Sequence, residues 1–177
     1  MSGIPNSKIL SAKVKLNCYS ATSSGNETMD IHRLGRAYVE SEATWNEYSS
    51  GNAWTVAGAD GAGTDRATAF MYQALPSATT GIFHIYALNL VEFNLMRAAA
   101  GYGMVFKMEG DAGDLRYYWS SDTGTVANRP IMEVTVSAGG SQVIFVASRV
   151  QDFYNELMRG LLSPGALRRR YREVCQI

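Results

Sequence analysis

The sequence has few of the residues that build disulfide frameworks, metal sites and most catalytic centres. It contains two cysteines and two histidines in 177 residues, and Cys18 and Cys175 lie far apart without metal-ligand spacing. This usage argues against a disulfide framework and leaves the redox compartment open. No Gly-x-Ser-x-Gly, His-Glu-x-x-His or phosphate-binding glycine loop occurs. We therefore expect a non-enzymatic protein that needs neither a metal nor a cofactor.

Long hydrophobic runs are also missing. No window of about 18 apolar residues occurs, and the N-terminus lacks a basic region followed by an apolar one. We therefore expect a protein that is neither secreted nor in contact with a membrane. The sixteen basic and sixteen acidic residues balance, but residues 149–177 hold six of the basic and three of the acidic ones. This basic end is a candidate contact surface.

What the sequence does contain is a series of short alternating segments. Between residues 8 and 19, apolar side chains fall largely on one parity and polar ones on the other, which predicts a half-buried strand. An apolar pattern at three- and four-residue steps predicts a short helix over 87–99. Many short strands and one small helix predict an all-β fold, an antiparallel jelly-roll-like β-sandwich with a C-terminal α-helical extension. Further strands are expected at 28–34, 64–75, 81–86, 102–108, 115–120 and 130–137.

The stretch 39–64 carries two tryptophans, Trp45 and Trp54, among Ser, Asn, Gly, Ala and Glu residues. Each indole offers more than about 100 Å² for burial, which a solvated loop does not use. We therefore expect this loop to fold back and cap the core.

The composition changes after residue 137. Residues 137–141 read as a linker, so we divide the chain into a sandwich at 1–137 and a tail at 138–177. In the tail, Val143–Ala147 is an apolar strand-like run, and a capping box at Ser148 precedes an amphipathic helical stripe. We expect this tail to serve docking or self-association. Its predicted assembly residues are Val150, Phe153, Tyr154, Leu157, Met158, Leu161, Arg168, Arg169, Arg170 and Arg172.

Several short pieces follow one another in a fixed order along the chain: Ile9-Leu-Ser-Ala-Lys-Val-Lys-Leu16, His32-Arg-Leu34, Glu42-Ala-Thr-Trp-Asn46, Trp54, Gly58-Ala-Asp60, Gly101-Tyr-Gly-Met104, Tyr118-Trp-Ser-Ser121 and Arg129-Pro-Ile-Met-Glu-Val134. By these pieces, residues 9–136 resemble the C-terminal two-thirds of a DNRLRE domain, a β-sandwich family related to carbohydrate-binding modules. In that family, further strands precede the piece that matches Ile9–Leu16, and Val143–Ala147 is a candidate to fill the open sheet edge.

Several side chains are candidates for a binding site, each with a structural alternative. Asp60 and Asp65 can offer oxygens to calcium, although aspartates in such glycine-rich loops usually serve turns. The acidic set Glu40, Glu42 and Glu47 can supply a carboxylate pair for glycoside hydrolysis or simply solvate the loop. Carbohydrate-binding candidates are the aromatic residues, with Trp119 and Tyr117 considered beside the selected set Trp45, Trp54, Tyr102 and Tyr118.

These observations favour a structural protein over an enzyme. We expect a bacteriophage virion component, such as a capsid decoration or a tail or fibre attachment protein, located in the virion after assembly in the host cytoplasm. It would form a homo-oligomer and contact other virion proteins. The alternative is a carbohydrate-binding module that recognises a polysaccharide, and a glycan-cleaving enzyme is a third option. The arginines of 168–172 suit phosphates, but an acidic protein partner is favoured over nucleic acid.

Overall fold

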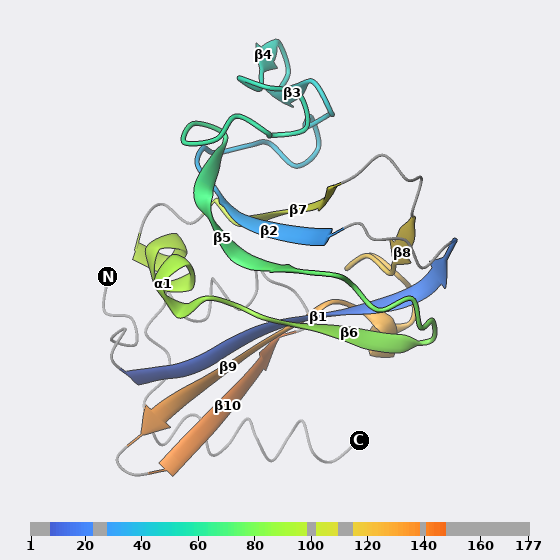
Figure 1. Cartoon of the computed structure of the whole chain (residues 1–177), viewed down its shortest axis with the longest axis vertical. Coiled ribbons are helices and arrows are strands. Elements are labelled where there is room, and N and C mark those ends of the chain that lie inside the picture. Colours follow the sequence, from blue (N-terminus) through green and yellow to red (C-terminus); the bar gives the residue numbers. More distant parts are fainter. Residues whose placement is uncertain (1–7, 23–27, 99–101, 110–114, 139–140, 148–177) are drawn as a thin grey trace.

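The structure, a computed structural model, describes residues 8–22, 28–98, 102–109, 115–138 and 141–147, with the backbone alone for 109, 138 and 141–147. Two antiparallel sheets, sheet A and sheet B, lie one above the other, with one helix at one end (Figure 1). This arrangement confirms the predicted all-β, sandwich-like fold. Among the described residues, no helix has the length and apolar character needed to cross a bilayer.

Sheet A is built around its longest strand, β1 (Ile9–Ala21). β6 (Ile82–Ala87) pairs along one edge of β1, while β9 (Ile131–Ala138) and then β8 (Arg116–Tyr118) pair along the other. The predicted alternation holds, since Ala12, Val14 and Cys18 are buried. On the outer face, Lys15 Nζ lies 2.6 Å from Glu133 Oε2.

Sheet B contains three strands in the order β5–β2–β7. They are β5 (Arg66–Ala74), β2 (Thr28–Leu34) and β7 (Met104–Glu109). In the central strand, Met29 and Ile31 face the other sheet, yet Asp30 and His32 are buried as well. β2 is therefore covered on both faces, although its apolar residues lie mainly on one.

Helix α1 (Leu90–Ala98) closes one end of the two sheets and confirms the predicted helix. The side chain of Asn89 accepts the backbone N–H of Val91 at 2.8 Å and so begins the helix. Phe93 is fully buried, and Arg33 Nε lies 3.3 Å from Glu92 Oε2, which ties the helix to β2. The core shared by the helix and both sheets comprises Ile9, Ala12, Val14, Met29, Ile31, Met71, Tyr86, Leu88, Phe93, Met96, Met132, Val134 and Val136.

The tryptophan-bearing stretch does not cap this core, so that expectation is wrong. Residues 35–65 form a lobe that projects beyond the ends of β2 and β5 at the top of Figure 1. The lobe contains a short hairpin of β3 (Glu47–Ser49) and β4 (Asn52–Ala53). Trp45 is 70% exposed, because its ring packs on the lobe itself and not on the sheets.

The end of the described chain also differs from the expectation. β10 (Ser141–Ala147) pairs with β9 over seven consecutive residues, beginning at Ser141 opposite Ala138. Ser137, Ala138 and Ser141 of the predicted linker are therefore paired strand residues, and the boundary at 137/138 falls inside sheet A. The prediction that Val143–Ala147 pairs with the sandwich is confirmed. The tail residues predicted for assembly, Val150 to Arg172, lie outside the described residues.

Candidate functional site

Three exposed aromatic side chains meet on the outer surface of sheet A, and we call this group the aromatic platform. Tyr19, Tyr117 and Trp119 are 47%, 41% and 36% exposed. The ring centroids of Tyr19 and Trp119 lie 4.6 Å apart, and those of Tyr19 and Tyr117 lie 5.9 Å apart, with interplanar angles of 38° and 46°. Each ring therefore contacts its neighbour while it keeps a surface toward solvent.

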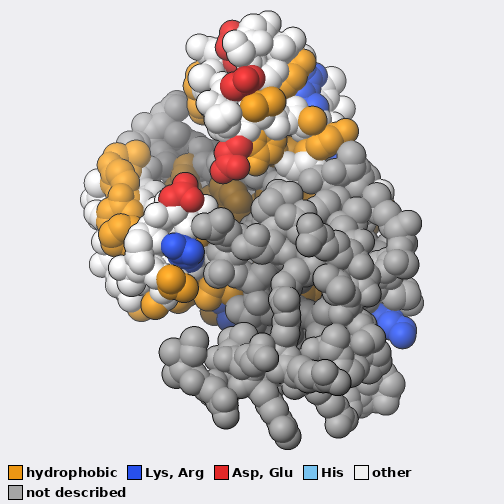
Figure 2. Space-filling view, turned by 180° about the vertical axis from the view of Figure 1, so that it is seen from behind, with side chains coloured by type: hydrophobic (Ala, Val, Ile, Leu, Met, Phe, Trp, Pro, Cys, Tyr) orange, Lys and Arg blue, Asp and Glu red, His pale blue; other side chains and the backbone are white. Residues whose placement is uncertain are grey.

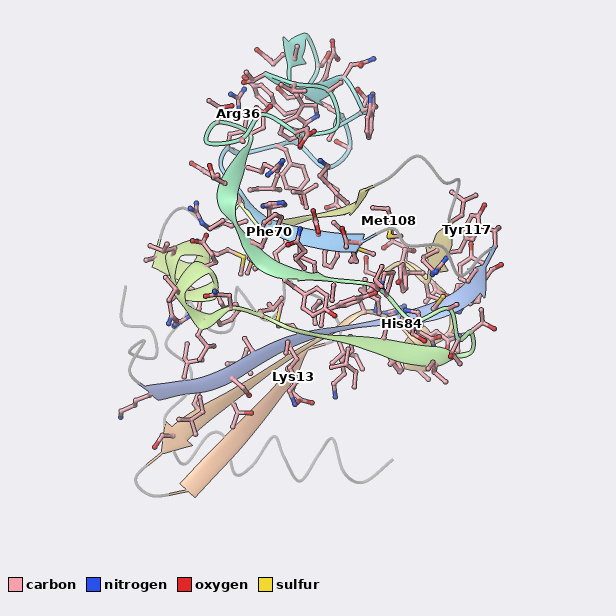
Figure 3. All side chains as sticks on the ribbon, viewed as in Figure 1. Lys13, Arg36, Phe70, His84, Met108 and Tyr117 are labelled. Atoms are coloured by element: carbon pink, nitrogen blue, oxygen red, sulfur yellow. The ribbon has the colours of Figure 1, made fainter. Side chains whose placement is uncertain are left out.

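Strand geometry explains why these three residues share one side. Neighbouring side chains of a strand point to opposite faces, and Cys18 and Tyr118 are paired residues that face the core. Tyr117 and Trp119 flank Tyr118 and therefore face outward. Tyr19 lies at a bulge between Cys18 and Ser20, where the extra residue is directed to the outer face. Figure 3 shows Tyr117 beside β8, at the end of the molecule away from α1.

Hydrogen bonds fix the platform from below. The backbone N–H of Trp119 donates to the carbonyl of Asn17 at 3.1 Å. The side chain of Asn17 in turn donates to Asn128 Oδ1 at 3.0 Å.

Figure 2, turned by 180°, shows hydrophobic side chains gathered at its left edge, the side on which β8 and the end of β1 lie. Tyr19 and Tyr117 are thus presented on paired strands, and Trp119, which directly follows β8, is held to β1 through its backbone.

Beneath the platform, the half-buried Tyr118 packs against the core and belongs to a chain of hydrogen bonds with His84 and Tyr86. The Thr79 carbonyl can only accept, so His84 donates from Nε2 at 2.8 Å. His84 Nδ1 then accepts the Tyr118 hydroxyl at 3.0 Å, and the Tyr86 hydroxyl donates to Tyr118 at 2.7 Å. Burial raises the pKa of both tyrosines. The structure therefore places Tyr118 inside, away from the ligand-facing position suggested for it.

The two lobe tryptophans have different surroundings. Trp54 Nε1 donates to the carbonyl of Thr44 at 3.0 Å, and its ring lies 5.6 Å from that of Tyr48. The guanidinium of Arg36 lies 4.9 Å from the Tyr48 ring centroid, a cation–π contact. Trp54 thus holds the lobe together, whereas Trp45 presents its ring to solvent.

The carboxylates of Asp60 and Asp65 are occupied by protein groups. Asp60 Oδ1 lies 2.6 Å from Lys107 Nζ and 2.7 Å from Arg66 Nη2. The hydrogen bond from Lys107 is the main cause of the lowered pKa of Asp60. Asp65 is fully buried and accepts two backbone N–H groups of its own lobe. These contacts support the structural alternative over calcium for both residues.

Arg66 also reaches the buried histidine of β2. Its Nη1 lies 3.2 Å from His32 Nε2, and His32 Nδ1 lies 3.2 Å from the Ala69 carbonyl, to which it donates. Burial first, and then the positive charge of Arg66, lower the pKa of His32 below 6.5. The imidazole is therefore neutral at physiological pH.

The remaining candidates are dispersed. Glu40 and Glu42 are exposed in the lobe, and Glu42 Oε2 accepts the N–H of Ser50 at 3.0 Å. Tyr102 lies two residues before the start of β7 in sheet B, so the structure does not join it to the platform on sheet A. Sequence reasoning missed Tyr19, although its position on the polar parity of β1 beside Lys13 and Lys15 was a usable signal.

Comparisons of the chain with protein-family models, with curated proteins and with solved structures found no match. The resemblance to DNRLRE domains stays a prediction. The site is accordingly defined by its own geometry, which is an exposed cluster of aromatic rings on the outer face of a β-sheet.

Proposed function

We propose that this chain is a non-enzymatic glycan-binding module that holds a sugar chain on the aromatic platform. The observation that carries the proposal is the contact between the exposed rings of Tyr19, Trp119 and Tyr117. A sugar ring has a face of C–H groups, and an aromatic ring offers a flat, weakly negative surface that such a face can cover. The platform therefore supplies exposed apolar area for stacking on more than one ring, with the ring planes tilted by 38° and 46° to one another.

The rigidity of the platform supports the same function. Tyrosine and tryptophan lose little side-chain entropy on binding. Tyr19 and Tyr117 lie on the paired strands β1 and β8, and Trp119, which directly follows β8, packs against Tyr19. The proposal includes the finer architecture implied by the resemblance to DNRLRE domains, namely a jelly-roll-like sandwich related to carbohydrate-binding modules. It is argued from the site and not from the fold, because one fold can carry many functions.

Affinity electrophoresis tests this function without knowledge of the natural ligand. The chain is run in native gels that contain xylan, hydroxyethylcellulose, galactomannan or glycol chitin. We expect at least one polysaccharide to slow the intact chain and Trp119→Ala to remove most of that effect. Val91→Ala is the matched control, because Val91 is an exposed apolar residue on α1, remote from the platform. Equal retardation of the intact chain and Trp119→Ala would refute the platform as the site.

We propose assembly as a second function, in which the chain is a virion component that docks through its C-terminal segment. The supporting observation is β10, an edge strand that pairs with β9 without a bulge. A regular edge strand is a template for pairing with another chain. The predicted amphipathic stripe follows it directly in the sequence.

Sedimentation of the full chain beside a chain that ends at residue 148 tests assembly. We expect the full chain to form a homo-oligomer. The shortened chain retains β10 and should keep its melting temperature, but it should associate much more weakly because the predicted amphipathic stripe is removed. A monomeric full chain at high concentration, or an oligomer that survives the deletion, contradicts docking through this segment.

A further inference from the structure

Trp45 is the most exposed large hydrophobic residue of the described chain, and its indole is nevertheless held in place. Its solvent exposure is 70%. The six-membered part of the ring fills the space beside Gly58, where an added Cβ would lie 2.5 Å from Cη2. The carbonyl of Trp45 also accepts the N–H of Gly58 at 2.6 Å. One side of the indole is therefore seated on the backbone while much of the ring remains open.

The packing of Trp45 against Gly58 requires an unusual backbone conformation at residues 58 and 59. Gly58 has φ +76°, and the next residue, Ala59, has φ +58°, a conformation that residues other than glycine rarely adopt. Such a residue costs free energy and persists only where the surroundings enforce it. Ala59 is buried, so the turn is fixed from within the lobe. The chain thus maintains a strained turn beside an indole that faces water.

A buried carboxylate holds the backbone on both sides of the Gly58 turn. Asp65 Oδ2 accepts the N–H groups of Val56 and Gly61 at 3.0 and 3.2 Å, one on each side of the Gly58 turn. Arg36 Nε lies 3.0 Å from Asp65 Oδ1, which links the start of the lobe to its end. The lobe is therefore a braced support for Trp45 and not a loose loop.

The surroundings of Trp45 indicate the kind of ligand. A protein partner would need about 800 Å² of contact with an apolar centre. The exposed surface of the lobe is instead rich in hydroxyl and amide side chains, and in Figure 2 its hydrophobic groups are interspersed with polar ones. These exposed polar residues include Ser41, Thr44, Asn46, Ser50, Asn52 and Thr55. A single stacking ring surrounded by such groups matches a sugar, which has one C–H face and a rim of hydroxyls.

We propose that Trp45 forms a second glycan-binding site, separate from the aromatic platform. This inference rests on the proposed glycan-binding function and adds a contact point on a different part of the fold. The lobe extends from sheet B, with Arg36 within it in Figure 3, whereas the platform lies on sheet A near the labelled Tyr117. A polysaccharide that reaches both sites is held more tightly than a short oligosaccharide, because the second contact becomes intramolecular.

Indole resonances test the two sites separately in one experiment. The three tryptophans give three indole N–H signals in a ¹⁵N correlation spectrum, which single Trp→Phe variants assign. The full chain is titrated with xylohexaose, cellohexaose, mannohexaose and chitohexaose. We expect the signals of Trp45 and Trp119 to shift with saturation, while that of Trp54, whose Nε1–H donates to Thr44, stays in place.

Variants connect the shifts to binding. We expect Trp45→Ala to weaken retardation in polysaccharide gels roughly fivefold or more, the size expected for one lost stacking contact. Trp119 should still shift in that variant, and an unchanged Trp54 signal will show that the lobe has kept its fold. If the variant disturbs Trp54, Trp45→Tyr replaces it, and binding should then be partly retained.

Each outcome decides between the two claims. A Trp45 signal that stays fixed while Trp119 shifts overturns the second site and leaves the platform standing. A shift of the Trp45 signal alone supports a glycan-binding site on the lobe and refutes the site on the platform. No shift in either signal for any probe, with no retardation in any gel, rejects both.

Discussion

Asp65→Ala should open the lobe while the two sheets stay folded. The carboxylate is fully buried and accepts the N–H groups of Val56 and Gly61. Leaving the buried N–H of Gly61 without a partner costs about 1–3 kcal/mol. The N–H of Val56 adds less, because that residue is half exposed. Arg36 also loses its ion-pair partner at 3.0 Å. This sum is comparable to the stability of a small structural unit, so we expect local unfolding of residues 35–64.

Amide hydrogen exchange measures this opening directly. In Asp65→Ala, the amides of Val56 and Gly61 should exchange orders of magnitude faster, whereas those of β2 should change little. Asp65→Asn keeps the shape and one acceptor oxygen and should show a smaller effect. If the lobe amides of Asp65→Ala exchange as slowly as those of the unchanged chain, the bracing role of the carboxylate is wrong.

The same carboxylate should respond to acid. Burial alone would raise the pKa of Asp65, but the N–H groups of Val56 and Thr55 and the charge of Arg36 outweigh it and lower that pKa. A carboxyl with a lowered folded-state pKa stabilises the fold above its unfolded value of about 3.9. The stabilisation is lost as the pH falls through the folded-state pKa. Fast lobe exchange should therefore appear below about pH 4.

Three further predictions concern other parts of the molecule. The pKa of His32 is lower in the folded chain than in the unfolded chain. As the pH drops below 6.5, the unfolded chain therefore binds a proton at His32 more readily, and the melting temperature should fall. His32→Gln should flatten that pH dependence, and an unchanged slope would contradict it. Gly58→Ala should displace the Trp45 ring and change its fluorescence. An unaltered spectrum would contradict the packing of this ring against Gly58. Phe93→Ala should cost about 3–5 kcal/mol in chemical denaturation, and a loss below about 1 kcal/mol would place this ring outside the core.

The strands and the helix were predictable because the patterns that produce them lie within short stretches of the sequence. Alternation along β1 follows from the two-residue period of a strand, and the three- and four-residue steps around Phe93 follow from the helical period. Both patterns are in the sequence, and both elements are in the structure. The start of the helix was predicted at 87, whereas the structure begins it after Asn89, whose side chain accepts the N–H of Val91.

The lobe was not predictable from the same reasoning. The size of Trp45 and Trp54 indicates a need for contacts but not which surface provides them. Here the contacts come from a glycine, a neighbouring tyrosine and the carbonyl of Thr44 in the same lobe. The two glycines between β9 and β10 were similarly ambiguous, because Gly-Gly suits both a flexible linker and a tight hairpin.

The candidate site was found in part. Tyr117 and Trp119 were considered from the sequence, whereas Tyr19 was not, and the selected Tyr118 lies on the opposite face. Tyr19 faces outward by alternation from Cys18, but only the pairing of β1 with β8 brings it beside Tyr117. Tyr118 faces inward because it pairs with the buried Cys18. This pairing joins distant parts of the chain and cannot be read from local sequence patterns.

A crystal structure of the chain with a bound oligosaccharide tests the central claim most directly. The oligosaccharide is the hexamer of whichever polysaccharide slows the chain in native gels. We predict a sugar ring stacked on Trp119 and Tyr19, with its C–H face toward the rings. A sugar bound elsewhere, such as on the outer face of sheet B beside Phe70, with the platform empty, would contradict the account.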